Sequence, residues 1–449
     1  MFSIKKFFNF KELGTNYRTE IFAGLTTFLA MVYILGVNPS MLQVTGMSTE
    51  GVFFATAISS GLACIVMGLI AKYPISLAPG MGLNALFTYT FVLGMGNTWE
   101  TGLSAVFVSS IFYLIISISG YRQKLLDTIP YELKIAICMG IGFFVAFIGL
   151  SSGGIILFTD NTVMMGNLLL PSTLLALISI ILTFIFHFKK VPLAIFISMI
   201  LTSIIGVVMV LLGFTDPTGL MPTVPHTMVS SNFDLSVVGG FLRGFGGLIS
   251  NPVNLVVMVF SALFVDLFDT TGSLLVLGRQ CGLVDKDGNG DGMDKAFLAD
   301  GIGTLIGSII GTSTVTSYTE SGTGIAVGGK TGLTTIVTGL LFIVSIFFAP
   351  FVLCLFTTSV TCGALVMVGI QHLLVVNLKD VDWTNLVIVS SIFMTILMII
   401  LTFSISLGIA WGFLTYALGI IVTKQYDKLH ISTVILSLIF IAYLFFGLL

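Results

Sequence analysis

Charge is what this sequence has least of. Its 449 residues include 18 lysines and arginines and 20 aspartates and glutamates, so 8% of the chain is charged, against about 25% in an ordinary soluble domain. Hydrophobic residues make up 56%, which at about 20 apolar residues per crossing suffices for more than a dozen membrane helices. The composition therefore excludes a water-soluble globule and predicts an all-α polytopic membrane protein. A net charge of −2 leaves no positive field, so we expect no nucleic-acid partner.

Cysteine is scarce as well. The five cysteines are scattered singly through mostly apolar runs, and none stands in a CxxC or Cys/His spacing. Zinc sites and disulfide frameworks need such clusters, so we interpret the five as small buried side chains and expect no metal and no cofactor. A cleavable signal-peptide pattern is also lacking, because the first residues mix charged and aromatic side chains. We expect residues 1–19 to form a cytoplasmic segment that leads into the first span.

Fourteen stretches of the chain are predicted to be membrane spans, and a further apolar stretch, 431–449, is either a fifteenth span or a packed terminal helix. The fourteen are 20–40, 51–71, 80–95, 101–119, 132–150, 170–187, 192–213, 252–278, 296–311, 321–329, 332–350, 356–374, 385–402 and 404–423. With the N-terminus inside, the loops predicted as cytoplasmic hold 17 of the 18 basic residues, and Arg243 is the exception. Because cytoplasmic loops are enriched in Lys and Arg, this distribution supports the orientation in a plasma or inner membrane.

The longest outer segment, 214–250, separates two halves of similar length that resemble each other. In the first half, the extended-type residues 74–79 precede a glycine-rich short helix at 80–85; in the second, 315–320 precede another at 321–326. Seven spans per half is an odd number, so the second half starts from the opposite side of the membrane. We therefore predict a 7+7 inverted repeat with short extended segments in spans 3 and 10. Paired interrupted helices of this kind mark the midplane binding site of a transporter, since exposed backbone at that depth must line a polar cavity.

We place seventeen of the twenty acidic residues in loops or at span ends, and three do not fit such positions. Asp266 and Asp269 lie in the middle of span 8, and Glu320 lies where the second extended piece meets its short helix. A carboxylate near the bilayer centre costs at least about 2.5 kcal/mol on insertion scales, so we expect all three to face one aqueous site. The alternative for Asp269 is a structural carboxylate bonded to a broken helix. The spacing i, i+3, i+4 and i+7 gives one polar helical face, made of Asp266, Asp269, Thr270 and Ser273.

The four histidines lie at predicted span ends or in loops, so we expect no basic group near these carboxylates; they are His187, His226, His372 and His430. Two carboxyl groups one turn apart cannot both ionise cheaply in a partly dry site, so one of them is expected to hold an exchangeable proton. Such a site favours a neutral ligand with N–H donors and disfavours anions. Asn84, in the first short helix, adds an amide that donates and accepts; the alternative for it is a contact between helices.

Five strings of residues resemble a known family in combination. They are Ala78–Ala85 (APGMGLNA), Asp266–Gly272 (DLFDTTG), Phe297–Gly301 (FLADG), Gly311–Ser321 (GTSTVTSYTES) and Gly329–Thr334 (GKTGLT). Together they look like the AzgA-like hypoxanthine/guanine/adenine permeases, a branch of the nucleobase-ascorbate (nucleobase-cation) symporters. The resemblance covers nearly the whole chain. One departure is visible, because the family commonly has Glu-Ser-Ala-Ala-Gly where this chain has Glu320-Ser-Gly-Thr-Gly324. The added hydroxyl of Thr323 leaves the preferred base open.

The resemblance implies the uracil-permease fold and a proton-coupled purine transporter that works by an elevator-like motion, usually as a homodimer. It implies a core of spans 1–4 (20–119) and 8–11 (252–350), and a gate of spans 5–7 (120–213) and 12–14 with the C-terminal helix (351–449), joined by an extracellular segment, 214–251. Carried over by position, the substrate-binding residues fall on Asn84, Asp266 and Glu320, with Thr319 and Thr270 beside them. The resemblance further implies that Asp266 and Asp269 form the proton-coupling pair and that the coupling ion is a proton.

Three alternatives stay open at this stage. The first is another solute on the same fold, such as uracil, xanthine, ascorbate or an inorganic anion, or coupling to sodium in place of protons. The second is an intramembrane aspartyl protease, which needs its two aspartates on facing helices, whereas Asp266 and Asp269 share one predicted helix. The third is an ion channel, although a single asymmetric site does not suggest the rings of charge that channels use.

Two motifs match known patterns only formally. Residues 324–331 fit the phosphate-loop pattern GxxxxGK[ST], but that loop needs an α/β sheet and a Walker B strand, so we reject ATP binding. Residues 285–296 begin like an EF-hand loop, yet Ala296 stands where the bidentate Glu belongs. We interpret that segment as a solvated turn.

Overall fold

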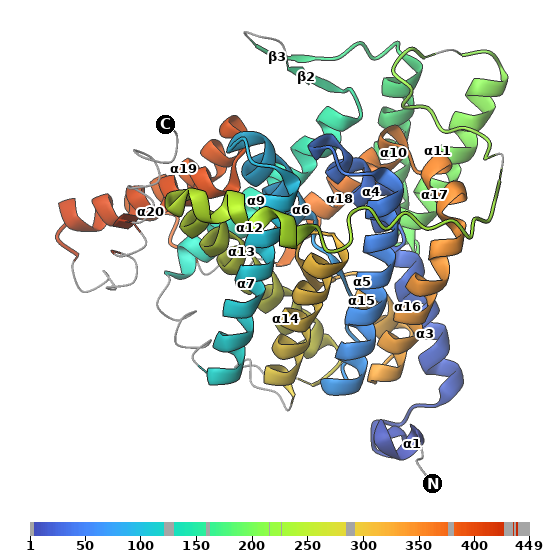
Figure 1. Cartoon of the computed structure of the whole chain (residues 1–449), viewed down its shortest axis with the longest axis horizontal. Helices are drawn as coiled ribbons and strands as arrows, with labels where there is room; N and C mark the ends of the chain where they lie inside the picture. The colour runs from blue at the N-terminus through green and yellow to red at the C-terminus, as the bar shows by residue number, and fades with distance from the viewer. Residues whose placement is uncertain are drawn as a thin grey trace.

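The molecule is a bundle of helices lying roughly side by side (Figure 1). The computed structural model describes residues 4–120, 130–158, 162–214, 216–225, 227–283, 292–375 and 381–425, together with Val434, Ser437 and Leu438. The stretch 431–449, predicted as a fifteenth span or a terminal helix, therefore lies outside the described residues apart from those three. All five cysteines are described and free.

A helix is found in each of the fourteen stretches predicted as spans. Their bounds are α3 (Tyr17–Met31) with α4 (Ile34–Leu42), α5 (Thr49–Ile70), α6 (Met81–Ala85) continued by a π-helical segment (Leu86–Gly94), α7 (Trp99–Ser119), α9 (Tyr131–Ser152), α10 (Pro171–Phe188), α11 (Ala194–Leu211), α13 (Pro252–Gln280), α14 (Met293–Ile310), α15 (Ser321–Ala326), α16 (Gly332–Ser345) with α17 (Ala349–Leu355), α18 (Thr358–Val375), α19 (Leu386–Thr402) and α20 (Ile405–Val422). Within the described ranges, nine helices are long and apolar enough to cross a membrane, and three shorter ones are apolar. The count of fourteen crossings stays a prediction.

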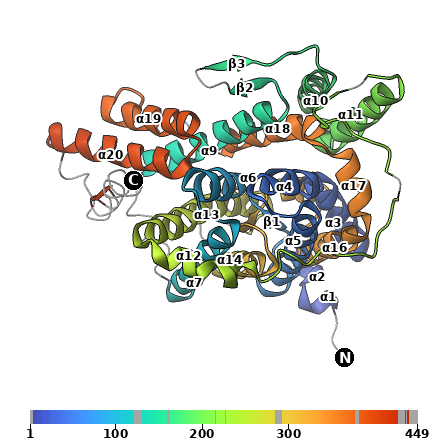
Figure 2. The same ribbon diagram turned by 45° about the horizontal axis from the view of Figure 1, so that its top comes forward.

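The helices pack in two groups. In the first group, α5 packs against α14 and α16, α3 against α16, and α7 against α13 and α14. In the second, α9 packs against α18 and α19, α10 against α11 and α18, and α19 against α20. Figure 2 shows the second group lying along one side of the first. The predicted core and gate, which are defined by relative motion, stay predictions.

Local chemistry explains where several helices begin and how closely they approach. The side chain of Ser48 accepts the backbone N–H of Gly51 at the start of α5, which satisfies one of the amides that a helix N-terminus leaves unpaired. Asn251 does the same for α13, whose first residue is Pro252. Between α5 and α16, a side chain added at Gly61 would meet the carbonyl of Gly339 at 2.9 Å. Glycine at this crossing therefore lets the two helices pack closely.

Two extended segments far apart in the sequence pair inside the bundle. Strand β1 (Leu77–Pro79) runs antiparallel to β4 (Val315–Ser317), with Ala78 opposite Thr316. Both strands are buried, and each is followed by a short helix, α6 after β1 and α15 after β4. These are the segments where the sequence predicted extended pieces. The pairing satisfies backbone groups that would otherwise be exposed at membrane depth.

Two elements outside the predicted spans were not foreseen. A hairpin of β2 (Ile156–Phe158) and β3 (Val163–Met165) follows α9. Helix α12 (Gly240–Ser250) lies within the predicted connecting segment 214–251 and runs across the ends of the upright helices (Figure 1). It buries Phe241, Gly244 and Leu248, a spacing that gives a helix one buried face. The guanidinium of Arg243, the basic residue that departs from the positive-inside pattern, lies 3.7 Å from Glu100.

Candidate substrate-binding site

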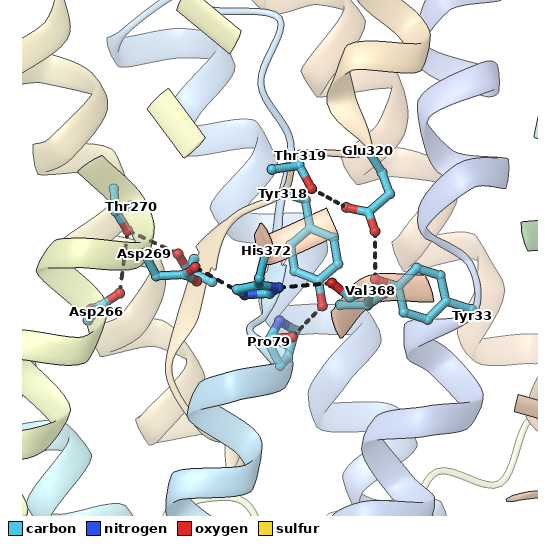
Figure 3. A network of polar contacts seen from close by, with 11 residues as sticks. Tyr33, Pro79, Asp266, Asp269, Thr270, Tyr318, Thr319, Glu320, Val368 and His372 are labelled. Atoms are coloured by element: carbon cyan, nitrogen blue, oxygen red, sulfur yellow. Dashed lines mark hydrogen bonds and ion pairs between the residues drawn. The ribbon is translucent and has the colours of Figure 1, made fainter. Parts of the chain in front are cut away.

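A cavity opens where the paired strands meet α13 and α18. Its walls come from both helix groups: α13, β4 and the start of α6 on one side, and α9 and α18 on the other. The residues that line it are Tyr33, Gly80, Met81, Cys138, Phe268, Asp269, Gly272, Ser273, Thr316, Ser317, Tyr318, Thr319, Glu320, Val368, Gln371 and His372. Figure 3 shows the polar contacts around it. The cavity therefore lies between the two groups, next to the ends of both strands.

Glu320 is placed in this cavity by the end of β4 and the start of α15. Its side chain is buried at 6% exposure, and the hydroxyl of Tyr33 donates to Oε1 at 2.8 Å. The hydroxyl of Thr319 donates to Oε2 at 3.3 Å. Each carboxylate oxygen has two lone pairs, so each keeps the capacity to accept a further N–H. The predicted residues Glu320 and Thr319 are thus brought together in the cavity.

Asp269 faces a histidine across the cavity. The Nε2 atom of His372 lies 3.6 Å from Oδ1 of Asp269, and Nδ1 of the same ring lies 3.0 Å from the carbonyl of Val368 (Figure 3). Asp269 belongs to α13 and His372 to α18, so this contact joins the two helix groups. The expectation that no basic group lies near the carboxylates was wrong. His372 is close to the end of its helix, as its sequence position indicated, but that end of α18 borders the cavity.

A buried polar network lies behind the cavity wall and includes a carboxylate that the sequence reasoning misplaced. Asp300 of α14 has no exposed surface and accepts the hydroxyls of Thr270 at 2.7 Å and Ser317 at 3.0 Å. Asp266 is also buried, and Thr304 donates to its Oδ2 at 3.3 Å. The placement of seventeen acidic residues in loops or at span ends was therefore wrong for Asp300. The network ties α13 and α14 to β4, and neither Asp266 nor Thr270 lines the cavity.

Asn84 lies in α6, away from the cavity lining. Its side chain has no exposed surface, and its Oδ1 accepts the hydroxyl of Ser313, next to β4. The residues of this unit that do line the cavity are Gly80 and Met81. Of the residues predicted from the sequence, the structure brings Asp269, Thr319 and Glu320 to the cavity and places Asn84, Asp266 and Thr270 behind it.

The segment that resembles a phosphate loop binds a carboxylate from another part of the same chain. Glu20 of α3 has no exposed surface, and it accepts the backbone N–H groups of Lys330 and Thr331, each at 3.2 Å. The hydroxyls of Thr331 and Thr334 donate to it at 2.7 and 2.6 Å. Two amides of the glycine-rich segment therefore cap a carboxylate of the same chain, and the placement of Glu20 at a span end missed its burial. In the part of the chain that is described, no group of three or more His, Cys, Asp or Glu side chains is arranged to hold a metal ion.

Known proteins share both the sequence and the fold. The Xan_ur_permease model, described as the permease family, matches residues 18–411. The guanine/hypoxanthine permease PbuG of Bacillus subtilis is 39% identical over 99% of this chain and 100% of its own length. The adenine permease AdeP of Escherichia coli is 37% identical over 98% of this chain and 95% of its own. The solved transmembrane domain of a cyanobacterium bicarbonate transporter, BicA, has a TM-score of 0.59 at 16% identity and covers 86% of this chain and 97% of that one.

The match with BicA concerns the fold alone, whereas the family model and the two permeases match nearly the whole sequence. The resemblance to AzgA-like purine permeases, drawn from the five strings of residues, is confirmed by these relatives. The aspartyl-protease alternative is set aside with it. The chain belongs to the Xan_ur_permease permease family, and it is a transporter, not an enzyme.

Proposed function

We propose that this protein takes up purine nucleobases, namely hypoxanthine, guanine or adenine, together with protons. The observation that carries the proposal is the cavity between the two helix groups, which holds two carboxylates, Asp269 and Glu320, and one histidine, His372. Homologous permeases named for guanine, hypoxanthine and adenine support the choice of purines. The N-terminus is proposed to be cytoplasmic and the protein to be a homodimer.

The cavity lining suits a planar base with N–H groups. Glu320 is already oriented by the hydroxyls of Tyr33 and Thr319, so its free lone pairs are fixed in direction. Purine N–H groups donate to a carboxylate with the strength of a charge-assisted bond. The rings of Phe268 and Tyr318 line the same cavity and offer faces against which the base packs. An anion would meet two carboxylates here, which argues against the bicarbonate-type alternative.

Proton coupling is proposed to act through Asp269, with Asp266 one helical turn away. Asp269 is the carboxylate that faces both the cavity and His372, whereas Asp266 is buried in the network with Thr304. A proton on the Asp266/Asp269 pair removes negative charge from the cavity before the base enters. Because the contact between Asp269 and His372 spans the two helix groups, a change in its charge alters how firmly they hold together. This provides the link between protonation and an elevator-like motion of one group against the other.

Uptake in transport-deficient cells tests the function directly. We expect radiolabelled hypoxanthine, adenine or guanine to accumulate, uracil to be taken up poorly, and accumulation to collapse with a protonophore. Asp269→Asn is expected to abolish protonophore-sensitive accumulation, whereas Asp216→Asn, in the connecting segment, serves as the matched control. Uptake that follows the sodium gradient, or competition by bicarbonate but not by purines, would contradict the proposal and favour the remaining alternatives on this fold: sodium coupling, uracil, xanthine, ascorbate or an anion.

A further inference from the structure

A second cavity reaches Glu320 from another direction. It lies between the turn that joins α10 to α11, helix α15 and helix α18, and it does not include Asp269 or His372. Three residues line both cavities: Thr319, Glu320 and Gln371. These three residues therefore form a wall that the two cavities share.

Gln371 is placed to contact a base in either cavity, because it lines both. It follows Ile370 and precedes His372 on α18, so it belongs to the second helix group while Glu320 belongs to the first. Its Oε1 atom is buried and accepts no hydrogen bond in the structure. A buried polar atom without a partner costs free energy, and a purine N–H in either cavity supplies the missing donor. The amide also donates, so it matches a ring nitrogen or a carbonyl of the base.

The second cavity has the lining of a site for a flat heteroaromatic ligand. One wall comes from the end of α10, the turn after it and the start of α11. It carries the ring of His187 and is otherwise apolar, at residues 191–195. The opposite wall carries polar groups of Thr319, Thr323 and Gln371. Ligand sites of this kind combine apolar walls with a few polar groups that set orientation. The same turn carries Lys189 and Lys190, and the positive-inside pattern predicts that it faces the cytoplasm.

We infer that the second cavity is a release station, a weaker second binding site that a purine base occupies between the main cavity and the cytoplasm. The inference rests on the proposed function and adds a site to it. Thr323, the residue that departs from the common family string, lies in this second cavity and not in the main one. Its hydroxyl donates to the carbonyl of Glu320 at 2.7 Å, and the hydroxyl oxygen keeps its own capacity to accept a hydrogen bond. The departure therefore acts on release and not on the choice of base.

A substitution that fills the second cavity alone tests this inference. Ala326 lines the second cavity and is exposed, and the next residue, Val327, is exposed and lines neither. We compare Ala326→Trp with Val327→Trp as the matched control in the full-length protein. Binding of radiolabelled hypoxanthine to purified protein reports the main cavity, and uptake by cells reports the complete cycle. We expect Ala326→Trp to keep the Kd within about twofold and to lower the maximal uptake rate about tenfold, because release then limits the cycle. Val327→Trp is expected to match the wild type in both.

A second variant keeps the test decisive if Ala326→Trp does not fold. Gln371→Leu removes the shared amide, and we expect the maximal uptake rate to fall about fivefold or more with a smaller rise in Kd. Uptake by the folded Ala326→Trp protein at the rate of Val327→Trp, or wild-type uptake by Gln371→Leu, would overturn the release station. If the wild type itself neither binds nor transports purines, the proposed function fails, and the release station fails with it.

Discussion

The two strand–helix units, β1 with α6 and β4 with α15, pair with each other but present different chemistry to the cavity. The first unit offers Gly80 and Met81 and keeps its polar residue, Asn84, sealed against Ser313. The second unit offers the whole run from Thr316 to Glu320. A side chain added at Gly80 would meet the side chain of Thr316 at 2.5 Å, so the first unit contributes a close backbone approach. The two units share the order of a strand followed by a short helix, but they do not share functional groups.

The difference shows how two units with the same order of elements form an asymmetric site. The carboxylate of Glu320 accepts a hydrogen bond from Tyr33, which lies in the turn between α3 and α4 in the first half. The hydroxyl of Tyr318, in the second half, donates at 2.5 Å to the carbonyl of Pro79 in the first. Each unit is thus held by a tyrosine from the other half of the chain, but only one of these tyrosines acts on a group that faces the ligand.

The largest expected effect comes from removing the carboxylate of the second unit. Glu320→Gln keeps the shape of the side chain but replaces one acceptor oxygen by an N–H₂ donor. Because hydrogen bonds to charged groups contribute about 1.5–3 kcal/mol, purine uptake at low substrate is expected to fall about 10- to 100-fold. Initial uptake rates of radiolabelled hypoxanthine measure it, with Glu12→Gln, at an exposed position of the N-terminal segment, as the control. Unchanged uptake would mean that the second unit does not hold the base.

Asn84, the polar residue of the first unit, is expected to affect folding stability more than affinity for the base. Asn84→Ala leaves the buried hydroxyl of Ser313 without its acceptor, which costs about 1–3 kcal/mol of folding free energy. The Kd for purine is expected to change less than about twofold, since Asn84 does not line the cavity. Thermal unfolding and equilibrium binding measure the two effects separately. Adding Ser313→Ala to Asn84→Ala is expected to recover part of the stability, because both partners are then absent. A loss of affinity at normal stability would instead make Asn84 a direct contact.

The two tyrosines provide a finer comparison. Tyr33→Phe removes a donor from Glu320, and we expect the apparent affinity for purine to fall about fivefold, in keeping with about 1 kcal/mol for one hydrogen bond. Tyr318→Phe removes a donor from a backbone carbonyl and is expected to lower thermal stability with a smaller change in affinity. Concentration-dependent uptake and thermal unfolding of both variants test the contrast. Equal losses of affinity would show that the tyrosines act on the cavity together.

The smallest expected effect concerns the contact between Asp234, in the connecting segment, and Ser48, at the start of α5. The hydroxyl of Ser48, and then the backbone N–H of Ser236, hold the pKa of Asp234 below its ordinary value of 3.8. A lowered pKa in the folded state stabilises the protein above pH 3.8, and this stabilisation is lost as the pH falls through the folded pKa. We expect Asp234→Asn to lower the unfolding temperature slightly at about pH 6 and to differ less from the wild type at about pH 3. A difference that grows on acidification would contradict this assignment.

Much of the fold could be predicted because its signals are local. Apolar runs located the helices, and proline and glycine next to them located the two extended segments that pair as β1 and β4. The carboxylates Asp266, Asp269 and Glu320 were found because a charge inside an apolar run stands out. Helix α12 was missed because its 11 residues are too few to cross a membrane, so a search for spans passes over it.

The missed polar residues depend on contacts between distant parts of the chain. His372 was assigned to an interface because it stands near a span end, and only the packing of α18 against the cavity shows that it faces Asp269. Asp300 was assigned to a span end, yet its partners Thr270 and Ser317 lie on two other elements. The carboxylate of Glu20 likewise accepts hydrogen bonds from backbone amides that lie far from it in the sequence. No periodicity within one span reveals such partners.

The pairing of β1 with β4 also has a consequence for how the protein is made. Roughly 235 residues separate Pro79 from Val315, its partner in the other strand. At about 5–20 residues per second, the ribosome takes about 10–50 s to deliver the second strand after the first. During that interval the backbone of β1 lacks the partner that its buried position requires. The first half therefore enters the membrane as an unfinished structure, and a chain that stops between the halves leaves this strand unpaired.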